Sequence, residues 1–195
     1  TGSGHTLWRN RQDWKGFEQI PFDTSGGVKL YGIFQMKGSP VNLLTTKGLY
    51  AWHNNEKRFE HLPFEIPAVG LRHHISRIDT CQGTLMYPVK GGVCAYNLAT
   101  GMTRTVPTQG EFAHLMAVTP DLAVLTGYLD DSYWIDFKRG ERIKIDALRY
   151  GFSSKSHNIN ILSFMALGAQ RFLVSSKFGL SEYDLDRDTF YQKRV

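Results

Sequence analysis

The sequence predicts an all-β protein, and more specifically a partial β-propeller. Three observations support this prediction. A glycine followed four residues later by Trp or Tyr recurs about every 44 residues along the 195-residue chain. Short apolar segments separated by polar turns surround each recurrence, and no long segment has the 3.6-residue periodicity of an amphipathic helix. A period of this length with four strands is typical of propeller blades, which bury their faces only by stacking on one another.

The repeat is clearest in the strand that carries the aromatic residue. Its pairs are Gly4 and Trp8, Gly48 and Trp52, Gly92 and Tyr96, and Gly179 and Tyr183. We expect the glycine to supply the positive φ of a two-residue turn. The aromatic ring is expected to pack between blades, with stacking on a sugar as the alternative. The last interval is close to two periods and predicts a hidden copy, which residues 122–137 provide, with Asp131 near the place of the glycine.

Four strands are expected in each copy, so residues 1–195 form one partial propeller of about four and a half blades of roughly 43 residues. The expected boundaries are a half blade at residues 1–22 and whole blades at residues 23–64, 65–107, 108–146 and 147–195. Residue 1 aligns with the end of a second strand. We therefore expect further blades upstream, in a propeller of about six to eight. One short helical turn is expected at residues 146–150.

The composition is that of a globular domain. Hydrophobic residues make up 42% and charged residues 21% of the chain, which excludes a disordered protein. The net charge of +5 is scattered without a basic run, which favours a solvated surface over a nucleic-acid footprint and is compatible with an anionic ligand. The sequence shows no membrane span and no signal peptide. Cys81 and Cys94 are expected to be buried free thiols, with one disulfide as the alternative.

Catalytic motifs are absent from the sequence. It contains no phosphate-binding glycine loop, nucleophile elbow, paired-cysteine metal spacing or His-Glu-x-x-His motif. Asp184, Asp186 and Asp188 alternate like the start of a calcium loop, but Val195 stands where the loop needs its glutamate. An acidic hairpin turn is the expected structure. The sequence therefore predicts no catalytic residue, no metal and no cofactor for this segment.

Candidate ligand contacts come from predicted turns and connections. Lys47, Lys90 and Lys177 occupy equivalent turns, so their ammonium groups could form a ring on one rim that attracts an anionic ligand such as an acidic glycan; ordinary exposed lysines are the alternative. Arg72 and His73 lie in a connection that enters an innermost strand. The full set of candidates is Lys47, Arg72, His73, Lys90, Tyr128, Arg149, Tyr150 and Lys177.

Three segments of the chain resemble the two-component-regulator propeller repeat. They are residues 44–52 (LTTKGLYAW) closed by Phe59, residues 174–184 (VSSKFGLSEYD) closed by Phe190 and, more weakly, residues 89–97 (VKGGVCAYN). The Trp-x-Gly-Thr that such repeats usually carry in the second strand is absent here. The resemblance covers most of the chain as a repeat.

The resemblance implies a place in the periplasmic sensor region of hybrid two-component systems of gut Bacteroidetes, Bacteroides among them. In that family two propellers and a small β-sandwich precede a membrane span, a histidine kinase and a response regulator with a DNA-binding domain. The usual ligand is an oligosaccharide from a dietary or host glycan. The implied partners of this segment are such a ligand, the remaining blades, neighbouring domains and a second copy, with no direct contact to nucleic acid or membrane.

The implied function is ligand sensing that regulates transcription through the rest of the chain. Two alternative functions stay open. A protein-interaction scaffold would bind no small molecule and would gain stability from a partner protein. A propeller hydrolase or lyase would need convergent carboxylates or a His–carboxylate pair at the axis, where Asp79 is the main acidic residue of the predicted inner strands.

Overall fold

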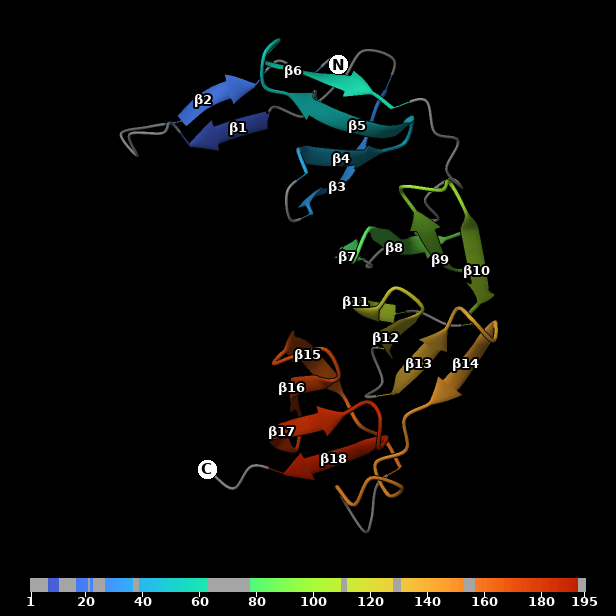
Figure 1. Cartoon of the computed structure of the whole chain (residues 1–195). Helices are drawn as coiled ribbons and strands as arrows, with labels where there is room; N and C mark the ends of the chain where they lie inside the picture. Colours follow the sequence, from blue (N-terminus) through green and yellow to red (C-terminus); the bar gives the residue numbers. More distant parts are fainter. Residues whose placement is uncertain are drawn as a thin grey trace. The chain divides into compact units, whose positions relative to one another are not determined.

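The computed structural model describes residues 7–10, 17–20, 22, 27–36, 39–62, 78–109, 112–127, 131–152 and 157–192. The chain divides into two compact units, Thr1–Val69 and Gly70–Val195, and each is described by itself. All regular structure in the described ranges is β-strand, which confirms the predicted all-β class (Figure 1).

No described segment forms a helix long and apolar enough to cross a membrane.

The first unit contains a two-stranded hairpin and a four-stranded sheet, both antiparallel. The hairpin consists of β1 (Leu7–Asn10) and β2 (Phe17–Ile20). The sheet consists, in chain order, of β3 (Leu30–Gln35), β4 (Val41–Thr45), β5 (Gly48–His53) and β6 (Arg58–His61).

The second unit contains three four-stranded antiparallel sheets, and neighbouring strands pair in chain order in each. One sheet consists of β7 (Asp79–Cys81), β8 (Thr84–Val89), β9 (Gly92–Asn97) and β10 (Thr103–Pro107). The next consists of β11 (Phe112–Thr119), β12 (Leu122–Gly127), β13 (Ser132–Asp136) and β14 (Glu141–Lys144). The third consists of β15 (Ile161–Ala166), β16 (Arg171–Ser176), β17 (Gly179–Asp184) and β18 (Thr189–Gln192).

The aromatic residues of the repeat lie in the core, as predicted. Trp52, Tyr96 and Tyr183 are all buried, whereas the Trp8 side chain lies outside the described part. The hidden copy is also present, because β13, in the β11–β14 sheet, carries the buried Trp134. Residues 147–150 form the short turn expected after β14.

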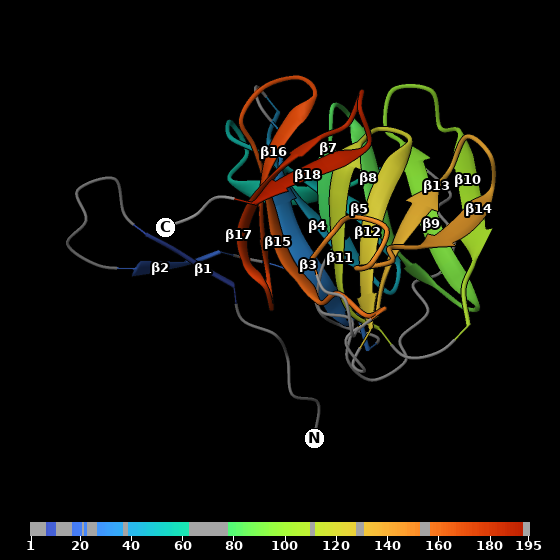
Figure 2. The same cartoon turned by 90° about the horizontal axis from the view of Figure 1, so that it is seen from below.

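Two hydrophobic cores hold the three sheets of the second unit together. The first joins the β7–β10 sheet to the β11–β14 sheet through residues such as Met86, Ala95, Leu125 and Ile135. Figure 2 shows these two sheets stacked on each other. The second joins the β11–β14 sheet to the β15–β18 sheet, where Trp134 lies 5.1 Å from Tyr183 between ring centroids. Each sheet thus buries a face against its neighbour, as propeller blades do.

The glycine of the repeat has two different roles. Gly48 and Gly179 have φ of +113° and +100°, as predicted for the start of the third strand. The same prediction is wrong for Gly92, because the positive φ of that turn, +82°, belongs to Gly91. At Gly92 an added Cβ would lie 2.4 Å from the Val106 carbonyl oxygen. Gly92 is therefore required for the close approach of β10.

Replacing the two adjacent glycines is expected to separate these roles. Gly92→Ala forces a Cβ against backbone and should lower the free energy of unfolding by about 2–3 kcal/mol. Gly91→Ala meets no atom within 4 Å and should cost only about 1 kcal/mol, from the left-handed backbone alone. Urea denaturation followed by circular dichroism measures both. Equal losses, or a larger loss for Gly91→Ala, would contradict the close-approach role.

Both cysteines are free thiols, which confirms that part of the prediction. Cys94 is buried, as expected, but Cys81 is only partly buried. Burial raises the pKa of both thiols.

Candidate functional site

An open depression of about 490 Å³ lies on the β15–β18 sheet. Side chains from β16, β17, β18 and the β17–β18 turn line it, namely Arg171, Glu182, Asp184, Arg187, Tyr191 and Gln192. The whole depression belongs to the second unit.

Strand alternation explains why these side chains gather there. Phe172, Val174 and Tyr183 point into the core shared with the β11–β14 sheet. Side chains one residue away on the same strands point to the other face. Arg171 pairs with Asp184 across β16 and β17, and Glu182 pairs with Tyr191 across β17 and β18. One side of this sheet is therefore core, and the other carries the charged lining.

A buried carboxylate forms the floor of the depression. The Glu182 side chain is only 8% exposed, whereas that of Arg171 is 62% exposed. The Arg171 guanidinium donates to Glu182 Oε1 through Nε, at 2.5 Å, and through a second nitrogen. A carboxylate removed from water needs such a charge partner. The pair therefore fixes the guanidinium beside the depression.

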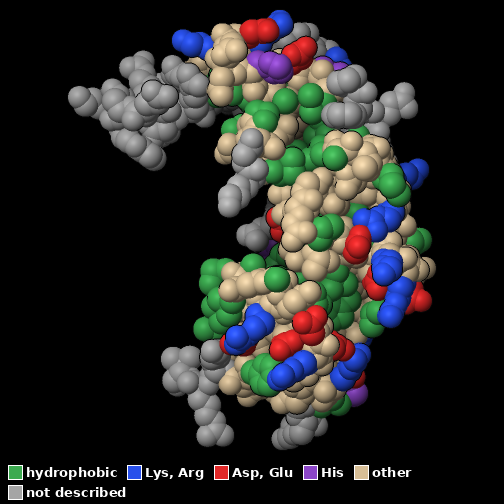
Figure 3. Space-filling view, in the orientation of Figure 1, with side chains coloured by type: hydrophobic (Ala, Val, Ile, Leu, Met, Phe, Trp, Pro, Cys, Tyr) green, Lys and Arg blue, Asp and Glu red, His purple; other side chains and the backbone are tan. Residues whose placement is uncertain are grey.

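The turn side of the depression is built from Asp184, Arg187 and Tyr191. The Arg187 backbone N–H donates to Asp184 Oδ1 at 3.1 Å, and the Arg187 guanidinium Nε lies 3.9 Å from Asp184 Oδ2. The same guanidinium donates to the Tyr191 hydroxyl at 3.4 Å, and Tyr191 is 43% exposed. In Figure 3 acidic and basic side chains lie beside one another over β17 and β18. The arrangement offers an aromatic surface and several hydrogen-bonding groups.

The turn lysines are exposed, and none of them lines the depression. Lys47 is in the β4–β5 turn of the first unit, and Lys90 and Lys177 are in the β8–β9 and β16–β17 turns of the second. The Lys177 backbone N–H donates to the Asn160 carbonyl at one end of the last sheet. At the other end, beside the depression, the Leu185 N–H donates to the Gln170 carbonyl. The structure thus separates Lys177 from the depression by the length of the strands.

Arg149 and Tyr150 lie in the connection after β14 and share one partner, Asp188. The Tyr150 hydroxyl donates to Asp188 Oδ1 at 2.7 Å, and the Tyr183 hydroxyl donates to the same oxygen at 2.9 Å. Arg149 donates to Asp188 Oδ2 at 2.5 Å. Asp188 itself has a left-handed φ of +47°. These contacts give Tyr150 a structural role between the connection and the last sheet.

The Asp188 contacts predict that stability falls at alkaline pH. Burial and the hydrogen bond to Asp188 raise the pKa of Tyr150 to about 12, and the same causes raise the pKa of Tyr183. Above pH ~10 the unfolded chain releases these protons first, so the free energy of unfolding decreases between pH ~10 and pH ~12. Urea denaturation at stepped pH measures the decline. Tyr150→Phe should reduce it, and an unchanged decline in that variant would contradict the assignment.

The remaining predicted contacts, Arg72, His73 and Tyr128, lie outside the described residues.

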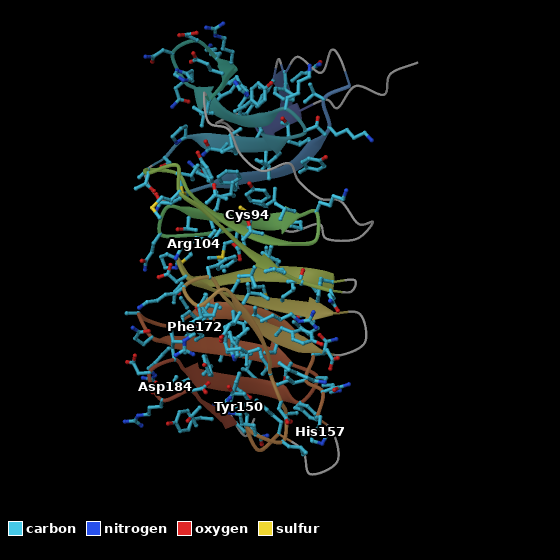
Figure 4. All side chains as sticks on the ribbon, turned by 90° about the vertical axis from the view of Figure 1, so that its right-hand side faces the viewer. Cys94, Arg104, Tyr150, His157, Phe172 and Asp184 are labelled. Carbon is cyan, nitrogen blue, oxygen red and sulfur yellow. The ribbon has the colours of Figure 1, made fainter. Side chains whose placement is uncertain are left out.

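Asp79 and the pair of Asp146 and His157 are the groups closest to what a propeller hydrolase or lyase would need. Both Asp79 oxygens accept backbone N–H groups, from Thr80 at 2.8 Å and Ala117 at 2.9 Å. His157 Nδ1 lies 3.1 Å from Asp146 Oδ2, and this hydrogen bond lowers the pKa of Asp146. The His157 side chain is 68% exposed, at the opposite strand ends from Asp184 (Figure 4). These contacts hold strands and a connection in place.

Over the described ranges, no group of three or more His, Cys, Asp and Glu side chains is placed to hold a metal ion. Asp184, Asp186 and Asp188 lie at the β17–β18 turn, as the predicted acidic hairpin requires.

Sequence reasoning did not select the side chains that line the depression. A signal was available in the repeat. Glu182 is a charged residue in β17, whereas the equivalent strands β9 and β13 carry Ala95 and Trp134 at this position. Its burial and its partner Arg171 could be seen only in the structure.

No protein-family model matches the chain, and no curated protein matches it.

Three of the solved structures similar to this chain contain β-propellers. The extracellular domain of the hybrid two-component system BT4673 from B. thetaiotaomicron matches 99% of this chain at 12% identity and a TM-score of 0.56. YCF48 bound to D1 peptide matches 96% at 10% identity and a TM-score of 0.63, and the Mitotic Checkpoint Complex matches 95% at 7% identity and a TM-score of 0.57. The chain spans 27% of the BT4673 chain and 60% of the YCF48 chain. Likenesses at this identity show the fold, and the fold is a β-propeller.

Proposed function

We propose that this chain is the ligand-recognition segment of a periplasmic sensor in a hybrid two-component system, and that it responds to an oligosaccharide. The observation that carries the proposal is the match of 99% of the chain to the extracellular domain of such a system. The repeat segments at residues 44–52 and 174–184 support it independently, because they resemble the two-component-regulator propeller repeat.

The proposed segment binds and does not catalyse. Asp79 uses both oxygens on backbone N–H groups, which leaves it suited to holding β7 and β11 together. The depression on the β15–β18 sheet offers an aromatic ring and hydrogen-bonding groups, which suit reversible binding. Its partners are an oligosaccharide, further blades and domains of the same chain, and a second copy.

Signalling in this proposal follows from differential binding. A ligand that binds one arrangement of the sensor more tightly than another shifts the population toward that arrangement. The membrane span and kinase that the resemblance implies would read this shift and regulate transcription.

Calorimetric titration of the chain with a panel of neutral and acidic oligosaccharides tests the proposal. We expect at least one panel member to bind saturably, with an unchanged oligosaccharide recovered after incubation. Absence of binding across the panel would contradict the proposed function, and release of shorter sugars would indicate the hydrolase or lyase reading.

A protein-interaction scaffold is the second candidate. It is favoured by exposed apolar side chains on the β15–β18 sheet, among them Leu162, Met165 and Leu180, and by the likeness to YCF48, which was solved bound to D1 peptide. This candidate predicts that a partner protein raises the melting temperature of the chain while the oligosaccharide panel leaves it unchanged.

A further inference from the structure

We propose that the depression on the β15–β18 sheet is the oligosaccharide site and that it selects uncharged oligosaccharides over acidic ones. This inference rests on the proposed function and adds the place and the ligand class. It differs from the sequence-based expectation, which put an acidic glycan on a rim of turn lysines.

The three sheets of the second unit can be aligned residue by residue, because the turn after the third strand makes the same hydrogen bonds in each. In each sheet the backbone N–H that follows this strand donates to the turn between the first two strands, through Leu98, Phe137 and Leu185. The residue before it caps its own turn with a side-chain oxygen, which belongs to Asn97, Asp136 and Asp184. Two residues earlier, on the same face, the equivalent positions are Ala95, Trp134 and Glu182.

In the β7–β10 and β11–β14 sheets, this position faces the sheet that follows in the chain. Ala95 packs in the core between the β7–β10 and β11–β14 sheets, and Trp134 packs in the core between the β11–β14 and β15–β18 sheets. In the β15–β18 sheet this position is Glu182, which is bound to Arg171. The residue equivalent to Arg171 in the β11–β14 sheet is Leu122, which pairs with Asp136. An ion pair thus stands where the two preceding sheets carry Ala95 and Trp134, and the exposed side chain of Leu180 lies on the same face of β17. The exposed guanidinium of this pair gives the face a polar group that a ligand can contact.

The charges of the depression balance. Arg171 and Arg187 supply two positive charges, and Glu182 and Asp184 supply two negative ones, within the same lining. An anionic ligand would meet the carboxylates without a net attraction, and a cationic ligand would meet the guanidinium groups. A neutral ligand rich in hydroxyl groups is the class that such a lining holds, because hydroxyls both donate and accept hydrogen bonds.

The remaining lining residues match the apolar C–H face and the hydroxyl groups of a sugar ring. Tyr191 is 43% exposed and offers a flat apolar ring for the C–H face of the sugar. Asp184, Arg187 and the Gln192 amide surround the same depression and can accept from and donate to the hydroxyls. The volume of about 490 Å³ lies within the usual range of small-ligand pockets.

Calorimetry of the 195-residue chain with size-matched neutral and acidic oligosaccharides is the test. We expect a neutral member of the panel to bind at least about tenfold more tightly than its acidic counterpart. Tyr191→Ala should weaken that binding about tenfold or more, and Tyr191→Phe, which keeps the ring, should retain most of it. Raising the salt from about 0.05 to about 0.5 M should change the affinity less than about twofold, because a neutral ligand has no charge to screen.

Two further variants separate failure of the site from failure of the function. Lys138→Ala, on the exposed β13–β14 turn, is the matched surface control and should bind like the parent chain. If an acidic oligosaccharide binds and the double variant Lys90→Ala with Lys177→Ala abolishes binding, the sensor proposal stands and the site in the depression is wrong. If no oligosaccharide binds, both fail. If Tyr191→Ala binds the neutral ligand like the parent chain, only the site is overturned.

Discussion

Trp134→Ala is expected to lower the free energy of unfolding of the second unit by about 3–5 kcal/mol. Trp134 is 6% exposed and lies in the core that joins the β11–β14 and β15–β18 sheets. Its ring contacts Tyr183 on the facing sheet, at 5.1 Å, and Phe164, at 5.8 Å. Alanine would leave a cavity between the two sheets, because their backbones cannot move together far enough to fill it.

Urea denaturation followed by far-ultraviolet circular dichroism measures this effect. Trp134→Phe keeps an aromatic ring in the core and should cost less, about 1–2 kcal/mol. Lys138→Ala, on the exposed turn after β13, is the surface control and should change stability by less than about 0.5 kcal/mol. A loss below about 1 kcal/mol for Trp134→Ala would show that this core does not hold the two sheets together.

Asp188→Ala is expected to cost about 3 kcal/mol, because it removes the shared acceptor of two tyrosine hydroxyls at about 1.5 kcal/mol each. Tyr183 is 2% exposed, so its hydroxyl would lose Asp188 in a place that water does not reach. The ion pair with Arg149 adds little, since the side chains of Arg149 and Asp188 are 59% and 41% exposed.

Two variants in the same turn check the Asp188 assignment. Asp188→Asn keeps an acceptor oxygen and tolerates the left-handed φ of +47°, so it should cost less than half as much. Asp186→Ala, in the same turn and exposed, should be close to neutral. A loss of similar size for Asp186→Ala would assign the effect to the turn rather than to the hydroxyl acceptor.

Much of the fold could be predicted because one strand of the repeat is a reliable marker. Gly48, Trp52, Gly179 and Tyr183 lie where the repeat places them, and the hidden copy around Trp134 is a real strand. The role of Gly92 could not be predicted. Two adjacent glycines leave the position of the positive φ open, and only the approach of the Val106 carbonyl shows which glycine needs its missing side chain.

The candidate site was less accessible to sequence reasoning. Exposed turn lysines such as Lys177 can be located from a repeat, but the repeat does not show which side chains line a depression. Tyr150 looked available for a ligand, whereas the structure gives its hydroxyl to Asp188, 38 residues later in the chain. The burial of Glu182 depends on Arg171 from a neighbouring strand, a contact that no local pattern records.

Both proposals place recognition on the β15–β18 sheet and use the rest of the second unit as its support. The core around Trp134 holds this sheet from one side, and the Asp188 contacts fix the turn from which Arg187 projects. Variants at Trp134 and Asp188 should therefore weaken ligand binding only as far as they unfold the sheet, whereas Tyr191→Ala should weaken binding without loss of stability.

Amide hydrogen exchange of the chain, with and without a saturating neutral oligosaccharide from the panel, tests the central claim most directly. The account predicts slower exchange in peptides that cover β16, β17 and β18, with the largest change near Tyr191, because a ligand in the depression shields these strands. Protection confined to the turns of Lys90 and Lys177, or no change in any peptide of the last sheet, would contradict it.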